Sequence, residues 1–175
     1  MEVEIKFRIS DPEKIERILR DRAEFVIEKI EHDYYFNHPC RDFRETDEAL
    51  RIRRDVEGIT LTYKGRKIDL ETKTREEFKV RLDDSETARK ILEKLGFRKA
   101  GEVVKKRKIY RDGDVVICLD HLEGVGSFVE LEIESDDVED AKRRIFKYAE
   151  MLGLGGEKSI RKSYLEMVLD VADSN

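Results

Sequence analysis

The sequence predicts an α+β fold of two β-α-β-β-β halves, whose antiparallel sheets curve toward one another and close a barrel. Three observations support this fold class. Charged and apolar residues alternate along most of the expected strands, the order of elements in the first half recurs in the second, and the junction between the first strand and the first helix is itself repeated. The length of 175 residues is typical of a single domain.

The first half begins with a strand over residues 2–9, where charged residues occupy one face and apolar residues the other. Residues 10–13, Ser-Asp-Pro-Glu, form a helix start because they supply a capping side chain and a proline in the first turn. Apolar residues at helical spacing extend this helix to about Arg22. The other strands of this half are expected at 25–36, 49–54 and 59–64, with a turn at 55–58.

The second half repeats this order, from an alternating strand at 75–82 to an amphipathic helix at 84–95 that ends at Gly96. The Asp-Gly pair at 112–113 predicts a hairpin turn. Strands are expected at 99–111, 114–120 and 127–135, followed by a helix from Asp136 to Leu152 and a glycine-rich break at 153–156.

The two halves also share residues. When the chain is shifted by 73 positions, 7 of the 16 residues from 4 to 19 meet an identical residue, among them Glu4 with Glu77 and Asp11 with Asp84. Such self-similarity indicates a duplicated strand–helix unit. We therefore predict one domain over 1–175, made of halves at about 1–73 and 74–157 and a C-terminal segment at 158–175.

Charge and composition exclude several classes of protein. The chain has 36 basic and 41 acidic residues, so its net charge of −5 fits neither a polybasic nucleic-acid binder nor an acidic tail. No apolar run reaches the roughly 18 residues of a membrane span, and charged residues begin at position 2, unlike a signal peptide. The two cysteines are too far apart for a Cys-x-x-Cys motif. The expectation is a cytoplasmic protein with neither nucleic acid nor membrane as partner.

The charged strand faces allow two interpretations. An antiparallel sheet with one solvated face explains alternating charges without any function, and from the pattern alone this is the simpler interpretation. If the faces point into a barrel, however, buried charges require counter-ions. Oxyanions would satisfy the Lys and Arg side chains, and hard divalent cations would satisfy the carboxylates. A metal-bound polyphosphate supplies both.

Motifs in order along the chain resemble the CYTH, or triphosphate tunnel metalloenzyme, superfamily, and within it the class IV adenylate cyclase branch most closely. The first is EVEIK at 2–6, which matches the E-x-E-x-K signature of the superfamily. The others are HDYYFNHP at 32–39, ALRIRR at 49–54, LTYKG at 61–65, TREEFKV at 74–80, KKR at 105–107, LDHLEGVGSFVELE at 119–132 and KSY at 162–164.

The resemblance implies a closed eight-stranded antiparallel barrel, or tunnel, and a role for each matching residue. Mg²⁺ or Mn²⁺ would be held by Glu2, Glu4, Glu130 and Glu132. The triphosphate would be bound by Lys6, Arg8, Arg51, Arg53, Lys64, Lys105, Arg107 and Lys162, although Lys158 and Arg161 compete with Lys162 for the C-terminal basic position. Lys6, Arg53, Asp120 and Glu77 would act in catalysis. One position departs from the family, because Lys79 stands where many relatives carry another Glu.

The activity implied by the resemblance is that of an adenylate cyclase, which converts ATP to cyclic AMP and pyrophosphate. The alternative is a triphosphatase that hydrolyses tripolyphosphate, thiamine triphosphate or a nucleoside triphosphate with the same charges. A third class is a non-catalytic polyphosphate or nucleotide binder, against which the two acidic motifs argue. Edge strands offer a way to pair two copies, but nothing in the sequence selects a homodimer.

Overall fold

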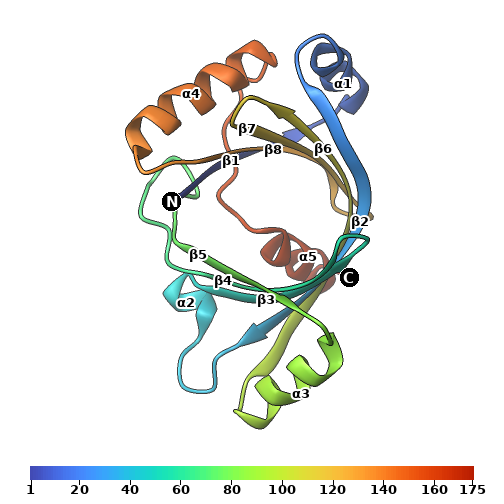
Figure 1. The fold of residues 1–175 in the computed structure, drawn as a ribbon, viewed down its shortest axis with the longest axis vertical. Helices are drawn as coiled ribbons and strands as arrows, with labels where there is room; N and C mark the ends of the chain where they lie inside the picture. The colour runs from blue at the N-terminus through green and yellow to red at the C-terminus, as the bar shows by residue number, and fades with distance from the viewer.

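The computed structural model describes residues 1–175, and its main element is an eight-stranded antiparallel sheet in the order β1-β8-β7-β6-β2-β3-β4-β5, curled into a tunnel (Figure 1). The strands are β1 (Glu2–Ile9), β2 (Glu24–Asn37), β3 (Ala49–Asp55), β4 (Gly58–Lys64), β5 (Glu77–Leu82), β6 (Arg98–Asp112), β7 (Val115–Leu122) and β8 (Gly126–Glu134). The helices are α1 (Pro12–Arg20), α2 (Phe43–Thr46), α3 (Ser85–Lys94), α4 (Val138–Met151) and α5 (Tyr164–Asp173). This confirms the predicted fold class.

The two edges of the sheet meet through the segment that precedes β5. Backbone hydrogen bonds join Glu2 and Arg75 in both directions, at 3.4 and 3.3 Å, and the Lys73 N–H donates to the Glu4 carbonyl at 2.8 Å. No ladder of backbone bonds runs between β1 and β5 themselves. The tunnel is therefore closed by residues 73–75 instead of by a strand pair.

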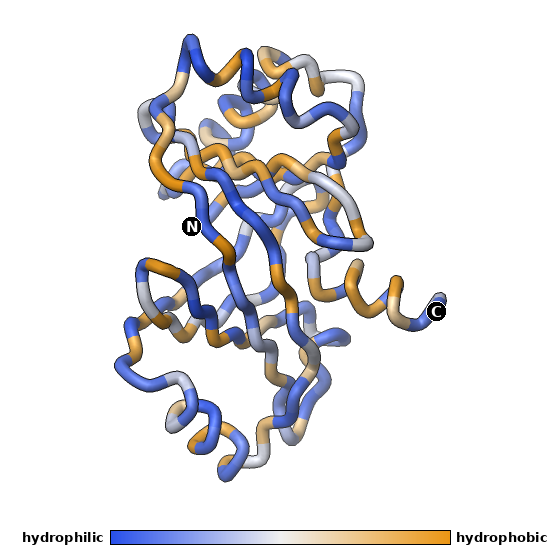
Figure 2. The backbone as a smooth tube through the Cα atoms, turned by 90° about the vertical axis from the view of Figure 1, so that its right-hand side faces the viewer, coloured by the Kyte–Doolittle hydropathy of each residue, from blue (hydrophilic) through white to orange (hydrophobic).

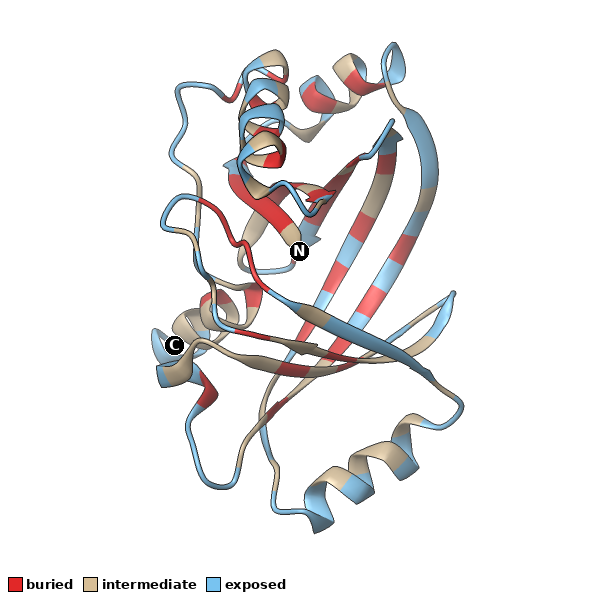
Figure 3. Ribbon diagram, turned by 60° about the vertical axis from the view of Figure 1, so that its left-hand side comes forward, coloured by how far each residue is buried: buried red, intermediate tan, exposed pale blue.

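The charged faces point inward, so the solvated-sheet interpretation is wrong for them. Glu4, Lys6, Glu31 and Lys105 are each at most 5% exposed. Along β2 and β6 buried and exposed residues alternate, as Figure 3 shows. These two long strands are largely hydrophilic (Figure 2), because their inward residues are charged and much of their outward face meets solvent.

Helices cover the apolar outer faces of the tunnel wall on two opposite sides (Figure 1). The larger core lies between β1, β7 and β8 and the helices α1 and α4. A smaller core joins β2 and β3 to α2 and α3. The third cluster is different, because Tyr164 and Met167 of α5 pack against the inward-facing Val103, Leu122 and Phe128. Helix α5 thus fills one end of the tunnel from inside.

The repeated aspartates cap equivalent helices. Asp11 accepts a hydrogen bond from the Lys14 N–H at the start of α1, and Asp84 accepts from Glu86 and Thr87 at the start of α3. The order of strands in the sheet is also symmetric. Exchanging each of β1 to β4 with the strand four places later gives the same order read from the opposite edge. Strand β1 consequently pairs with β8, and β5 with β4, so each half contributes its first strand to the sheet of the other.

We expect Asp11→Ala and Asp84→Ala each to lower the free energy of unfolding by about 1 kcal/mol, because each removes an N-cap acceptor. The measurement is urea denaturation followed by circular dichroism. Asp83→Ala is the control, since Asp83 precedes the cap of α3 and its side chain makes no hydrogen bond. A cost at Asp83 as large as that at Asp84 would contradict the capping role.

The boundaries differ from the predicted ones at a few places. The strand expected at 75–82 begins at Glu77, because residues 73–75 close the tunnel. Helices α2 and α5 were not among the predicted elements; α2 has only four residues, and α5 begins at a capping box of Ser163 and Glu166. No helix of the structure has both the length and the apolar character to cross a membrane.

Candidate active site

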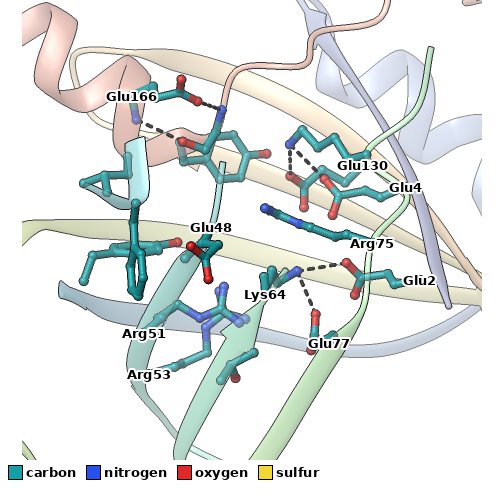
Figure 4. A pocket seen from close by; sticks show the side chains of 18 of the residues that line it. Glu2, Glu4, Glu48, Arg51, Arg53, Lys64, Arg75, Glu77, Glu130 and Glu166 are labelled. Carbon is teal, nitrogen blue, oxygen red and sulfur yellow. Dashed lines mark hydrogen bonds and ion pairs between the residues drawn. The ribbon is translucent and has the colours of Figure 1, made fainter. Parts of the chain in front are cut away.

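A cavity of about 440 Å³ lies inside the tunnel, and every strand contributes side chains to its wall (Figure 4). Because alternate residues of a strand point to the same face, the motifs that read E-x-E or R-x-R in sequence deliver their charges to this one space. The segment before β5 adds Lys73 and Arg75, and α2 and α5 line one end. The cavity combines carboxylates and cations in a wall that excludes most solvent.

Three carboxylates of the cavity wall form a cluster. Ligand oxygens of Glu4, Glu130 and Glu132 all lie within 4.8 Å of one another. The antiparallel register of β1 and β8 explains this, since Glu4 stands opposite Glu132 and Lys6 opposite Glu130. Glu132 makes no ion pair, and burial together with the nearby Glu2 and Glu4 raises its pKa to about 8. Three oxygen donors in a buried wall suit a hard divalent cation such as Mg²⁺ or Mn²⁺.

Glu2 lies outside that cluster, on the far side of Arg75 in Figure 4. Its carboxylate is 2.9 Å from Lys64 Nζ, which is also 2.8 Å from Glu77. Burial, with the neighbouring Glu4 and Glu77, raises the pKa of Glu2 to about 7 despite Lys64. The fourth carboxylate of the predicted metal set is therefore placed to hold Lys64 in this structure.

Two arginines present buried N–H groups that nothing in the protein satisfies. Arg51 Nε and Arg75 Nε are both buried without a hydrogen-bond partner. The only carboxylate within 4.0 Å of Arg51 is that of Asp33, at 3.9 Å. Buried donors are nearly always paired, because an unmade hydrogen bond costs about 1–3 kcal/mol. Unpaired guanidinium donors in a cavity wall favour an oxyanion ligand such as phosphate.

Two further cations of the cavity, Arg53 and Lys105, are held by a pair of buried carboxylates on β2, Glu31 and Asp33. Arg53 binds Asp33 with two hydrogen bonds of 2.7 Å and reaches Glu31 at 3.0 Å. Lys105 Nζ lies 2.9 Å from Glu31 and 3.1 Å from Asp33. Burial alone would raise the carboxyl pKa of Glu31 and Asp33. Arg107 and Lys105 beside Glu31, and Lys105 and Arg51 beside Asp33, nevertheless hold both pKa values well below the usual range. Glu31 and Asp33 thus set the cationic wall in place.

Asp120 lies outside the cavity and is paired with Arg107. Arg107 binds it with two hydrogen bonds of 2.6 Å, and the Tyr164 hydroxyl donates a third at 2.6 Å. Arg107 also bonds Glu130 at 2.6 Å, and Lys6 lies 3.1 Å from the other oxygen of Glu130. Asp120 does not line the cavity, so it acts on the site through the position of Arg107.

Most of the predicted site residues are brought together here, and two are not. Arg8 is exposed, donates to the Val125 carbonyl at 2.8 Å and lies over the Phe128 ring, and Lys162 pairs with Asp170 at the surface. The cavity is lined by the remaining predicted residues apart from Asp120, namely Glu2, Glu4, Lys6, Arg51, Arg53, Lys64, Glu77, Lys105, Arg107, Glu130 and Glu132.

Sequence analysis did not assign Glu31, Lys73 and Arg75 to the site. The sequence does hold a signal for Glu31, because it alternates with Lys29 and Asp33 along a predicted strand. Arg75 is the first residue of the strand predicted at 75–82 and shares a face with Glu77, so alternation could have assigned it. Lys73 lies instead in a polar stretch without strand or helix periodicity, and such a stretch is normally exposed. Only the closure of the tunnel buries Lys73 and Arg75.

The raised carboxyl pKa values predict an unusual pH dependence for the metal-free protein. Glu2 and Glu132 have an ordinary pKa of 4.5 and pKa values of about 7 and 8 in the folded state. Between pH 5 and 7 the folded state therefore binds more protons than the unfolded state, so stability falls as the pH rises. Burial and Lys73 lower the pKa of Lys6 to about 7, so the contribution of Lys6 increases only above pH 7.

The test is thermal denaturation in EDTA from pH 5 to pH 7. The melting temperature should fall over this range, and Glu132→Gln, which is neutral at every pH, should reduce the slope. A melting temperature that rises steadily from pH 5 to 7 would contradict these assignments.

Comparison with known proteins finds a matching family model and similar chains of nearly the same extent. The model of the CYTH domain matches residues 1–164. A protein of Methanocaldococcus jannaschii named a "putative adenylate cyclase" is 42% identical over 171 residues, which are 95% of this chain and 98% of that protein. Adenylate cyclase CyaB of Aeromonas hydrophila is 34% identical over 93% of this chain and 86% of its own.

Solved structures share the fold. The PH1819 protein of Pyrococcus horikoshii superposes with a TM-score of 0.86 at 40% identity, over 97% of this chain and 99% of that one. A Hippeastrum protein, HpAC1, has a TM-score of 0.68 at 22% identity over 97% of this chain and 96% of its own, which shows the same fold. That protein is described as a "putative adenylyl cyclase" with a dominant triphosphatase activity.

Proposed function

Because the chain belongs to the CYTH domain family, we propose that it is a divalent-metal-dependent enzyme that acts on a triphosphate inside the tunnel, as a class IV adenylate cyclase does. The 3′-hydroxyl oxygen of ATP would attack the α-phosphorus and lose its proton to solvent. The bond from that phosphorus to the oxygen bridging the α- and β-phosphates would break, which releases pyrophosphate and cyclic AMP. The observation that carries this proposal is that one buried cavity holds both unpaired arginine donors and a cluster of three carboxylates.

Each group of side chains has a separate task in this reaction. Arg51 and Arg75 have free donors for phosphate oxygens, and Lys64 supplies a point charge beside them. Glu4, Glu130 and Glu132 would hold Mg²⁺ or Mn²⁺, which supplies positive charge that stabilises the departing pyrophosphate. Arg53, Lys105 and Arg107 are fixed by their carboxylate partners, so they stabilise charge on the phosphates without reorganising.

Hydrolysis is the second candidate, because nothing in this cavity restricts the attack to the α-phosphorus. The same charges would stabilise a water molecule attacking the terminal phosphorus of tripolyphosphate, thiamine triphosphate or a nucleoside triphosphate. The two relatives named adenylate cyclase support the first candidate, and the activity described for HpAC1 supports the second.

Product analysis separates the two candidates. The protein would be incubated with ATP, tripolyphosphate and thiamine triphosphate, each with Mg²⁺ and with Mn²⁺, and the products separated by ion-exchange chromatography. Cyclic AMP with equimolar pyrophosphate is the expected result. Orthophosphate without cyclic AMP would replace the cyclase by a triphosphatase, and no product from any substrate would leave only binding.

A further inference from the structure

Lys73 is buried at 4% exposure although it belongs to neither a helix nor a strand. Its backbone N–H donates to the Glu4 carbonyl at 2.8 Å. The loop before it is anchored from outside the tunnel, since Lys142 of α4 binds Asp69 at 3.0 Å and Arg161 donates to the Asp69 carbonyl at 3.0 Å. The backbone of Lys73 is thus fixed beside β1, and its side chain enters the same cavity wall as Lys64.

The Lys73 ammonium contacts two of the three clustered carboxylates. Its Nζ lies 2.9 Å from Glu4 Oε1 and 3.8 Å from Glu130 Oε1. Glu130 has Lys6 and Arg107 as further cation partners, whereas Lys73 is the only cation partner of Glu4. Figure 4 shows Glu4 and Glu130 directed toward the same point. Lys73 therefore supplies, at Glu4, the positive charge that buried carboxylates require.

A divalent cation held by the same cluster would need oxygens of the same two carboxylates, Glu4 and Glu130. The Lys73 ammonium occupies a lone pair of Glu4 Oε1, and its positive charge repels a divalent cation bound to the same carboxylate. The Lys73 ammonium and a divalent cation therefore compete for the charge of Glu4. The lysine stem is flexible and its ammonium is a compact charge, so Lys73 can turn away from Glu4 while its backbone stays in place. The anions nearest to it in the cavity would then be phosphate oxygens of the substrate.

We propose that Lys73 is a built-in competitor of the divalent cation, which turns from Glu4 to a phosphate oxygen when metal and triphosphate bind. This inference rests on the metal-dependent function proposed above. Its consequence is coupling: Lys73 weakens the binding of metal to the free protein, and a triphosphate that draws Lys73 away strengthens it. By linkage the metal strengthens triphosphate binding by the same factor.

The test is Mn²⁺ binding to the metal-free, triphosphate-free protein, measured from the electron paramagnetic resonance signal of unbound Mn²⁺. Lys73→Met and Lys73→Gln should each bind Mn²⁺ about tenfold more tightly than the unaltered protein, a coupling of ordinary size. Lys142→Met is the matched control, because it also removes one positive charge and loosens the same loop without touching Glu4. Its affinity should stay close to that of the unaltered protein.

The Lys73 variants leave Glu4 without a counter-ion, so they are expected to be less stable than the unaltered protein. A second measurement therefore tests metal binding through its effect on stability. Mn²⁺ should raise the melting temperature of Lys73→Met by more than it raises that of the unaltered protein, because tighter binding to the folded state stabilises it further. Variants that bind Mn²⁺ no more tightly, and gain no more stability from it, would overturn the proposal while the metal site stands. Failure of every protein to bind Mn²⁺ would overturn both the proposal and the metal-dependent function.

Discussion

Replacing Glu132 by glutamine should lower kcat at least about 1,000-fold while the fold stays intact. The bound metal stabilises transition-state charge by several kcal/mol, and each loss of about 1.4 kcal/mol slows the reaction about tenfold. Glu132 is the clean choice among the clustered carboxylates because it makes no ion pair. Replacing Glu130 would instead remove the carboxylate that Lys6, Lys73 and Arg107 share, and Lys6 has no other ion pair. Glutamine also matches the neutral form that Glu132 adopts below its pKa of about 8.

The measurement is steady-state turnover of whichever triphosphate the product analysis identifies, together with Mn²⁺ binding and the far-ultraviolet circular dichroism spectrum. Glu134→Gln is the matched control, because Glu134 lies two residues further along β8 with a side chain that is 79% exposed. We expect that variant to keep its activity. A folded Glu132→Gln protein with full turnover would exclude Glu132 from the metal site and require another ligand set.

The parts of this site that the sequence predicts are those that depend on strand alternation. Once residues 2–6 and 126–134 are strands, Glu4, Glu130 and Glu132 must point to one face, and antiparallel pairing of the two strands brings them together. Arg51 and Arg53, or Lys105 and Arg107, follow by the same rule. Alternation does not show which face of the sheet is enclosed, so the same pattern fits a sheet with one solvated face.

The parts that the sequence does not predict depend on long-range closure. Lys73 and Arg75 are buried because the ends of the sheet meet at their segment, and no local periodicity marks Lys73. Arg8 keeps the alternation of β1 but lies beyond the point where α5 fills the tunnel, so it bonds Val125 at the rim. The pairing of Arg53 and Lys105 likewise depends on Glu31 and Asp33, which lie on another strand.

Arg107→Met should cost about 3–5 kcal/mol of unfolding free energy, because it removes one partner of a buried ion-pair network and leaves the others uncompensated. Asp120 would keep only the Tyr164 hydroxyl as a partner, in a place where its side chain is fully buried. Arg51→Met is the matched control. Asp33 lies 3.9 Å from Arg51 and keeps Arg53 and Lys105, so that variant should lose substrate binding with little change in stability.

Urea denaturation of both variants, with Asp120→Asn and the double variant Arg107→Met/Asp120→Asn, separates the structural role of Arg107 from its contact with substrate. Asparagine removes the orphaned charge, so the double variant should be less destabilised than the sum of the two single variants. Additive costs would mean that Arg107 and Asp120 are not coupled. Arg107 would then owe its position to Glu31 and Glu130, and the bonds from Asp120 and Tyr164 would not be what holds it in the cavity wall.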